Sequence, residues 1–318
     1  MRARGLVKRY DEVLAVDHVD LHVRAGDVYG FLGPNGAGKT TTLRMALGLI
    51  APSEGSVELF GRDPMRDGAA ALQGVAGFVE APRFYPYLTG RKNLELLAAL
   101  DGGDARTRIE EALETVDLAA RGKHKVGGYS HGMRQRLGIA AALLRDPRLL
   151  ILDEPVTGLD PAGMRDMRRL IERLTGEGIT VLLSSHQLPE VQELCDRVAI
   201  VNRGRIVYEG ALDELRRMAG ASHRLHTSDD ARAGEIAGEV AAVQVVESEG
   251  GELRVRGPER AIGELSLALA AANVAIFALT PELATLEDLF FRLTEGREPG
   301  TEQQSAPAQA QALSGAGR

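Results

Sequence analysis

Cysteine, aromatic side chains and long apolar runs are all scarce in this chain of 318 residues. Its one cysteine, Cys195, has no second thiol to pair with, which excludes an internal disulfide. No stretch reaches the ~18 apolar residues that a membrane-spanning helix needs, and even the run at residues 149–152 stops at Asp153. We therefore expect a cytoplasmic protein with no leader, for which any membrane function would require a partner that spans the bilayer.

The charge balance argues against general binding to nucleic acid or to anionic membranes. The formal net charge is −7 and no basic block of five or more residues occurs, so no general attraction to nucleic acid or anionic lipid is implied. Hydrophobic residues make up 44% and charged residues 26% of the chain, which is typical of a globular protein and excludes disorder of the whole. A chain of this length can form one large core with an appendage.

A glycine-rich stretch at residues 33–40, GPNGAGKT, fits the pattern G-x-x-x-x-G-K-[ST]. The apolar residues 28–32 precede it as a predicted strand, and residues 41–47 follow it as a predicted helix. Glycines are needed because backbone N–H groups must turn onto phosphate oxygens, where a Cβ would block the approach. Lys39 would reach the outer phosphates and the Thr40 hydroxyl would hold Mg²⁺. A chance glycine turn is the alternative, which the flanking strand and helix disfavour.

Two acidic residues follow the apolar run at residues 149–152. Because this run does not alternate, it predicts a strand buried on both faces of a parallel α/β sheet. Asp153 and Glu154 would then lie at the carboxyl end of the strand, at the edge where the phosphate loop lies. The apolar strand at residues 180–184 brings His186 to the same edge. A solvated strand end is the alternative interpretation of the two acids, and their buried neighbours disfavour it.

The remaining segments surround this core. Residues 2–32 predict a small β-layer, in which Tyr10 could either stack on a base or simply pack. The cluster PRFYPY at residues 82–87 indicates either a buried plug, which is the more usual case, or a docking surface. Residues 89–144 read as helical throughout, an insertion into the α/β core.

The pattern changes beyond about residue 217. Weak strands and two helices follow in the order βαββαβ, which is the arrangement of ferredoxin-like modules. A final amphipathic helix is predicted over residues 286–293. From residue 296 onwards Gln, Ala, Ser, Pro and Gly dominate without any period, so we expect a disordered tail.

Five of these stretches have the order and spacing of motifs in ATP-binding cassette (ABC) transporter ATPases. They resemble Walker A (33–40), the signature (129–136, YSHGMRQR), Walker B (149–155, LLILDEP), the D-loop (158–161, GLDP) and the switch histidine (184–186, SSH). The resemblance covers roughly residues 3–215. Glu80 with the sequel FYP, and the later stretch TLEDLFF, are similar to the drug and antibiotic export branch.

The resemblance implies a fold of class α/β: a P-loop NTPase core with a β-subdomain (1–81 and 147–217) and an inserted helical subdomain with the signature (82–146). The residue pattern beyond this core predicts a small α+β accessory domain with a ferredoxin-like arrangement (218–295) and a disordered tail (296–318). The implied function is ATP binding and hydrolysis in an exporter of drug, antibiotic or lipid-like substrates, driving a separate permease by ATP-dependent dimerisation.

The resemblance also assigns roles to individual residues, with ATP and Mg²⁺ as cofactors. The implied catalytic residues are Glu154 as general base, His186 at the γ-phosphate, and Lys39. The implied nucleotide contacts are Tyr10, Gly33, Pro34, Asn35, Gly36, Ala37, Gly38, Lys39, Thr40, Thr41, Ser130, Gly132 and Asp160. The implied magnesium ligands are Thr40, Glu80 and Asp153.

In this family the signature of one subunit faces the ATP of another, so a homodimer with two shared sites is implied. Ser130 and the backbone of Gly132 would contact the partner's nucleotide, while Ser130 could also cap its own helix. The other implied partners are separate transmembrane permease subunits, with no nucleic acid expected. The protein would then be peripheral on the inner face of the cell membrane.

The chain departs from the common family pattern at two motifs. Glu80 stands where most relatives have glutamine, and its carboxylate can ligate magnesium but cannot donate a hydrogen bond. His131 and Met133 alter the signature, where Ser-Gly-Gly-Gln is commonest. Two other functions compete with export: a soluble cassette ATPase of repair or translation, and a weakly hydrolysing nucleotide-dependent regulator. The first usually carries paired cassettes or long coiled coils, and the sequence predicts neither.

Overall fold

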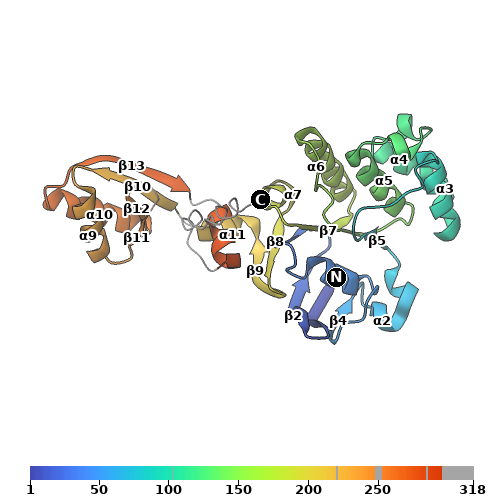
Figure 1. The fold of residues 1–318 in the computed structure, drawn as a ribbon, viewed down its shortest axis with the longest axis horizontal. Helices are drawn as coiled ribbons and strands as arrows, with labels where there is room; N and C mark the ends of the chain where they lie inside the picture. Colours follow the sequence, from blue (N-terminus) through green and yellow to red (C-terminus); the bar gives the residue numbers. More distant parts are fainter. Residues whose placement is uncertain (102, 220, 248–252, 284–285, 296–318) are drawn as a thin grey trace, which may run out of the picture. The chain divides into compact units, whose positions relative to one another are not determined.

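The computed structural model describes residues 1–101, 103–219, 221–247, 253–283 and 286–295. The chain divides into two compact units, Met1–Met218 and Ala219–Arg318, which we describe separately (Figure 1). Among the described helices, none combines the length and apolar character needed to cross a membrane. The expected disorder of residues 296–318 lies outside the described residues.

A six-stranded sheet forms the centre of the first unit, and five of its strands run parallel. In sheet order these are β5 (Val75–Phe78), β6 (Leu149–Leu152), β7 (Thr180–Ser185), β3 (Val28–Leu32), β8 (Arg197–Asn202) and the antiparallel β9 (Arg205–Ala211). Every residue of β3, β6 and β7 is buried, which explains why their sequences are apolar without alternation. The predicted α/β core with a parallel sheet is confirmed.

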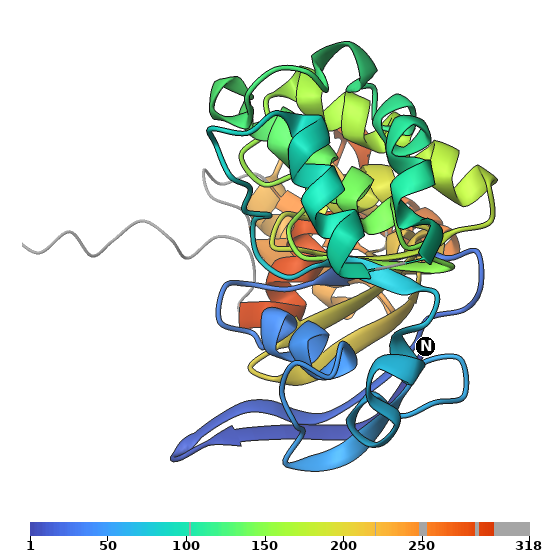
Figure 2. The same ribbon diagram turned by 90° about the vertical axis from the view of Figure 1, so that its right-hand side faces the viewer.

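A smaller antiparallel sheet in the same unit has the order β2 (Val13–His22), β1 (Arg2–Tyr10) and β4 (Glu54–Glu58). Figure 2 shows these blue strands as a separate layer at the bottom of the view, with helix α1 (Lys39–Ala46) packed against them. Leu6 and Val19 from this sheet, Phe31 from β3 and Leu43 from the first helix are fully buried in one apolar core. The phosphate loop between β3 and that helix therefore lies on a packed support.

Eight α-helices occur in the described part of the first unit: α1 (Lys39–Ala46), α2 (Pro64–Asp67), α3 (Gly90–Asp101), α4 (Ile109–Thr115), α5 (His131–Leu143), α6 (Pro161–Gly176), α7 (Leu188–Leu194) and α8 (Leu212–Ala219). Short 3-10 turns lie at Gly68–Leu72, Gly103–Arg108, Ala119–Arg121 and Val126–Gly128. Helices α3, α4 and α5 pack on one another, as predicted for a helical insertion (Figure 2). The sequence analysis did not predict α2, α7 or α8, which have four to eight residues and so offer at most about two turns from which to recognise a helical period.

The aromatic segment that precedes α3 does not form a buried plug. Tyr85 and Tyr87 are 54% and 64% exposed, with ring centroids 5.7 Å apart. The buried Asn93 of α3 holds this segment: its Oδ1 accepts from Tyr85 N at 2.8 Å, and its Nδ2 donates to Tyr85 O at 3.1 Å. The plug interpretation is therefore wrong for the tyrosines, which are presented to solvent on a fixed backbone.

The second unit is a four-stranded antiparallel sheet with helices packed on it. Its elements along the chain are β10 (Ala221–Thr227), α9 (Asp230–Glu239), β11 (Gln244–Glu247), β12 (Leu253–Arg256), α10 (Glu259–Ala271), β13 (Ile276–Leu283) and α11 (Leu286–Glu295). The sheet order is β11-β12-β10-β13, and Leu225, Val255 and Leu265 are among the buried core residues. The predicted βαββαβ order is the one observed; the ferredoxin-like identification stays a prediction.

Candidate functional site

The phosphate loop joins β3 to α1 with a backbone that only glycine can supply at critical points. Gly38 has φ +100°, and a Cβ there would lie 2.5 Å from the carbonyl oxygen of Ala15. At Gly33 a Cβ would lie 2.3 Å from the carbonyl oxygen of Val201. These contacts are far shorter than van der Waals separations, so the loop passes against neighbouring backbone where no side chain fits.

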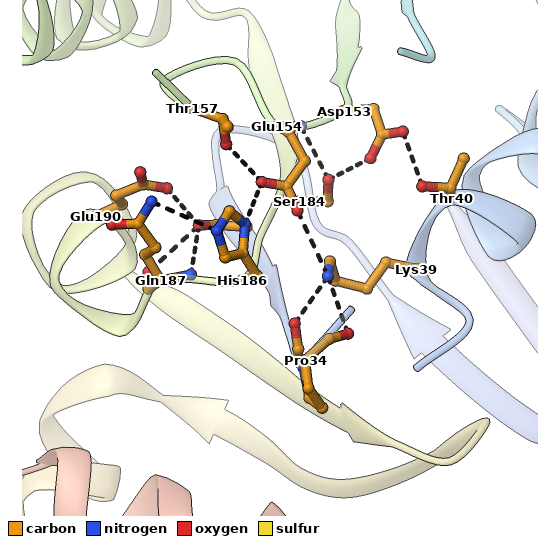
Figure 3. A network of polar contacts seen from close by, with 12 residues as sticks. Pro34, Lys39, Thr40, Asp153, Glu154, Thr157, Ser184, His186, Gln187 and Glu190 are labelled. Atoms are coloured by element: carbon orange, nitrogen blue, oxygen red, sulfur yellow. Dashed lines mark hydrogen bonds and ion pairs between the residues drawn. The ribbon is translucent and has the colours of Figure 1, made fainter. Parts of the chain in front are cut away.

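Lys39 is the first residue of α1, and its side chain points into the site toward the loop carbonyls (Figure 3). Its side chain is 5% exposed, and its ammonium group donates to the carbonyl oxygens of Gly33 at 2.7 Å and Pro34 at 3.2 Å. The same nitrogen lies 3.4 Å from Glu154 Oε1. A buried positive charge is thus held between the loop and the acidic end of β6.

Asp153 connects three elements at this edge of the sheet. Its Oδ2 accepts from the Thr40 hydroxyl of α1 at 3.0 Å, and its Oδ1 accepts from the Ser184 hydroxyl of β7 (Figure 3). Ser184 Oγ in turn accepts from Glu154 N at 3.0 Å. The sequence-based expectation that the acids meet the loop is confirmed for Asp153, because the carboxyl ends of β6 and β7 lie beside it.

Glu154 has a left-handed backbone, with φ +52°. One of its carboxylate oxygens, Oε2, accepts from Thr157 Oγ1 at 2.6 Å and from His186 Nδ1 at 2.6 Å (Figure 3). Burial raises its pKa, but these two hydrogen bonds and the positive charge of Lys39 outweigh the burial, so the pKa of Glu154 lies below its ordinary value. The carboxylate is therefore ionised at neutral pH, as a proton acceptor must be.

These groups border one cavity of about 730 Å³. The residues from the predicted site that line it are Asn35, Gly36, Gly38, Lys39, Thr40, Thr41, Glu80, Asp153, Glu154 and His186. The predicted residues that do not line it are Tyr10, Gly33, Pro34, Ala37, Ser130, Gly132 and Asp160. The loop, both acids and the histidine are thus brought together, as the order of the motifs predicted.

Three predicted contact residues that do not line the cavity have other surroundings. Ser130 caps α5, accepting from Met133 N at 3.2 Å, and Asp160 caps α6, accepting from Gly163 N at 2.8 Å. Tyr10 is 44% exposed, with Lys8 Nζ 5.1 Å from its ring centroid. The predicted capping role of Ser130 is confirmed. The exposure of Tyr10 does not support the alternative that its ring simply packs in the protein. The contacts of all three residues with a nucleotide stay predictions.

Sequence reasoning missed several side chains that hold the site together. Arg44 of α1 forms an ion pair with Glu80, whose backbone N donates to Asp153 Oδ2 at 3.4 Å. Thr157 and Ser184 hydrogen-bond the two acids directly. Ser184 lies on the buried strand β7, two residues before His186. A hydroxyl on an otherwise apolar buried strand needs a hydrogen-bond partner, and this could have indicated its contact with the acids. Nothing in the sequence pointed to Arg44.

Residues 16–157 match the ABC transporter family. The chain is similar to the bacitracin transport ATP-binding protein BcrA of Bacillus licheniformis, with 40% identity over 298 residues, covering 93% of this chain and 97% of that protein. The chain belongs to the ABC transporter ATP-binding family. Membership of this family establishes the P-loop NTPase fold of the core and makes the protein an ATPase.

One further relative and one solved structure are similar to this ABC ATPase. It is 43% identical over 219 residues to the daunorubicin resistance ATP-binding protein DrrA3 of Streptomyces coeruleorubidus, covering 68% of this chain and 69% of that protein. It also resembles the solved structure of MJ0796, described as a dimeric bacterial ABC transporter cassette, with a TM-score of 0.58 and 26% identity, covering 66% of this chain and 98% of that one. The relatives place the protein in the drug and antibiotic export branch.

Replacing Ser184 with alanine is expected to lower ATP turnover about tenfold, because both acids lose a hydrogen bond that orients them. Buried polar atoms of Asp153 and Glu154 would be left unpaired, so the free energy of unfolding should fall by about 1–3 kcal/mol. Steady-state ATPase assays and denaturant unfolding measure the two effects. Ser266→Ala, which removes a hydroxyl bonded within α10, is the matched control. Unchanged turnover in Ser184→Ala would contradict this role.

Proposed function

We propose that this ABC ATPase is the ATP-driven subunit of an exporter for drug, antibiotic or lipid-like compounds. The observation that carries the proposal is the convergence of Lys39, Glu154, His186 and the Thr40–Asp153 pair on one cavity. Its support is the resemblance to proteins named for bacitracin transport and daunorubicin resistance. ATP would bind with its phosphates along the loop, where the backbone and Lys39 supply positive charge.

The residues at the end of β6 fit a magnesium ion. The hydroxyl of Thr40 and the carboxylate of Asp153 are hard oxygen donors 3.0 Å apart, and Mg²⁺ is usually held by one or two such groups together with phosphates and water. Glu80 would be a further ligand, once released from its ion pair with Arg44. When bound, the ion would neutralise charge on the phosphate oxygens.

Glu154 would act as the general base. Its ionised carboxylate would take a proton from the water that attacks the γ-phosphate, while Thr157 and His186 hold it in place. The bond from His186 Nδ1 places a hydrogen on that nitrogen and holds the ring beside the acid, at the edge of the cavity where the γ-phosphate would lie. Lys39 would stabilise the charge that builds up on the leaving phosphate.

The full site would need a second copy of the chain. Ser130 and Gly132 do not line the cavity of their own chain, whereas the family arrangement brings them to the ATP of a partner. The likeness to a cassette described as dimeric supports this arrangement. ATP would then favour closure by touching both chains, and hydrolysis would remove the γ-phosphate contacts that hold them together.

We also propose that the permease docks on a groove beside α3. The groove has a volume of about 380 Å³ and borders the exposed aromatic segment; Phe84, Leu97 and Leu100 are among its lining residues. Leu97 and Leu100 are 39% and 86% exposed and line the same groove, and a cluster of exposed apolar side chains of this kind marks an interaction surface. A membrane-spanning partner docked here would hold the ATPase at the inner face of the membrane.

Leu100→Glu should abolish co-purification with the permease while ATP turnover of the isolated protein stays within about twofold. A charge in the groove would have to be desolvated on docking, which is unfavourable, but the groove is separate from the residues lining the ATP cavity. Pull-down from detergent-solubilised membranes measures the effect. Leu267→Glu places the same charge on an exposed leucine of α10 and serves as the control. Equal permease recovery with both variants would rule out this groove.

Affinity purification of the tagged full-length protein tests the export function against its competitors. We expect a polytopic membrane protein to co-purify, and compounds carried by that permease to stimulate ATP hydrolysis. Retention only by DNA or ribosomes would support the alternative of a repair or translation ATPase. The alternative of a weakly hydrolysing regulator requires that turnover be negligible even with the permease present.

A further inference from the structure

His131, the unusual residue of the signature stretch, contacts its own chain. Its ring Nε2 lies 3.0 Å from the main-chain oxygen of Thr157, in the loop that follows Glu154. Because a carbonyl oxygen only accepts, Nε2 must carry the hydrogen of this bond. The ring also packs near Gly158, and the side-chain nitrogen of Gln135, one helical turn further along α5, lies 3.4 Å from Nε2. With hydrogen on both nitrogens the Gln135 contact is not a hydrogen bond, so the bond to Thr157 O is the one that orients the ring.

Thr157 carries this connection on to the acid. Its Oγ1 donates to Glu154 Oε2 at 2.6 Å, and its backbone N donates to Glu154 O at 3.3 Å. Thr157 is thus tied to Glu154 by main chain and side chain together. The same carboxylate oxygen also accepts from His186, so a displacement of Thr157 would alter the geometry around the acid.

The start of α5 therefore combines a proposed contact with a second copy and an observed contact with its own chain. Ser130, at its N-cap, belongs to the segment that would meet the nucleotide of a second copy. His131, the next residue, is bonded to the loop that positions Glu154 in its own chain. A shift of α5 on engaging a partner would be transmitted through His131 and Thr157, because each bond in the series joins adjacent groups.

We propose that His131 is a positioning residue that couples the signature helix to Glu154 of the same chain through Thr157. The inference rests on the proposed function, since it takes Glu154 as the base. Its consequence is that each copy's acid is aligned according to the position of its own signature helix, which in turn contacts the other copy's ATP. Both sites of a dimer would therefore be adjusted together.

The test compares two replacements of His131 in the full-length protein with Mg-ATP. His131→Leu removes the N–H donor with little loss of volume, and should lower kcat about fivefold, the effect of one net hydrogen bond, with KM for ATP unchanged within twofold. His131→Gln keeps a side-chain N–H at similar reach and should restore at least half of the lost kcat. A purely structural role would lower the melting temperature in both variants without this difference, and would overturn the proposal.

The series of contacts is tested by combining His131→Leu with Thr157→Val, which removes the hydroxyl that bonds Glu154. If the coupling reaches the acid through the Thr157 hydroxyl, as the short bond to Oε2 indicates, His131→Leu should lower kcat by less than twofold in the Thr157→Val background. Independent, multiplying effects would overturn the proposal, as would a change confined to KM or to ATP-driven dimerisation. If Glu154 is not the general base, Glu154→Gln will retain ATP turnover, so that outcome is distinguished from a failure of the coupling through His131. Inactive Glu154→Gln with wild-type kcat in His131→Leu would reject the coupling alone.

Discussion

Replacing Glu154 with glutamine is expected to lower ATP turnover by at least about 100-fold while ATP binding persists. Glutamine has nearly the same shape and can still accept from the Thr157 hydroxyl, but it cannot take a proton from water. The phosphate loop and Lys39 are unchanged, so the nucleotide still binds. Because hydrolysis no longer discharges the closed state, the variant should accumulate as a dimer with Mg-ATP. Steady-state ATPase assays, nucleotide-binding titrations and size-exclusion chromatography measure these three properties.

Glu264→Gln is the matched control for this prediction, since it makes the same change on the exposed face of α10, where Glu264 forms an ion pair with Arg260. This control should keep wild-type turnover. If Glu154→Gln retained activity, Glu154 would not be the base. An inactive variant that stays monomeric at saturating Mg-ATP would instead refute the shared-site dimer, leaving the assignment of the base intact.

Replacing Lys39 with alanine is expected to lower turnover by about 100- to 1,000-fold and to weaken ATP binding as well. Its ammonium group lies inside the site, bonded to the carbonyls of Gly33 and Pro34 and 3.4 Å from Glu154. A charge at this position attracts the phosphates in the ground state and stabilises them more strongly as they gain charge. Loss of the charge should therefore raise the ATP dissociation constant and lower kcat together.

Lys92→Ala removes a lysine of the same length from the exposed face of α3, where it pairs with Glu95, and is the appropriate control. Radiolabelled ATP binding and single-turnover hydrolysis separate the two expected losses for Lys39→Ala. Circular dichroism confirms that both variants fold. A Lys39→Ala variant that hydrolyses ATP within threefold of the wild-type rate would exclude the proposed role of Lys39.

Much of the fold could be predicted from the sequence because it depends on local patterns. Unbroken apolar runs predicted the buried strands β6 and β7. The aromatic segment was misjudged because a cluster of tyrosines is equally compatible with burial and exposure. The tertiary structure shows that hydrogen bonds between Asn93 and Tyr85 and from Gly127 N to Pro86 O fix the backbone, and that the rings of Tyr85 and Tyr87 lie outside.

The phosphate loop and the two acids could be predicted because their roles depend on residue types at fixed positions along the chain. Glycines, lysine and threonine within eight residues specify a phosphate loop, and acids at the end of a buried strand must lie near it in a parallel sheet. Pairings between distant segments were not predictable in the same way. The ion pair of Arg44 with Glu80 and the bond of His131 to Thr157 depend on how α1, α5 and the loops pack, and long flexible side chains leave no periodic signal.

The sequence by itself determined the family, the loop that receives a triphosphate, and the order of acids and histidine along the chain, because each of these is a matter of residue type at a fixed spacing. The tertiary structure alone decided the direction in which each side chain is held. It places Lys39 against Glu154, joins Thr40 to Asp153, and turns His131 toward its own Thr157. These directions follow from contacts between segments more than 20 residues apart, which packing brings together and local sequence does not encode.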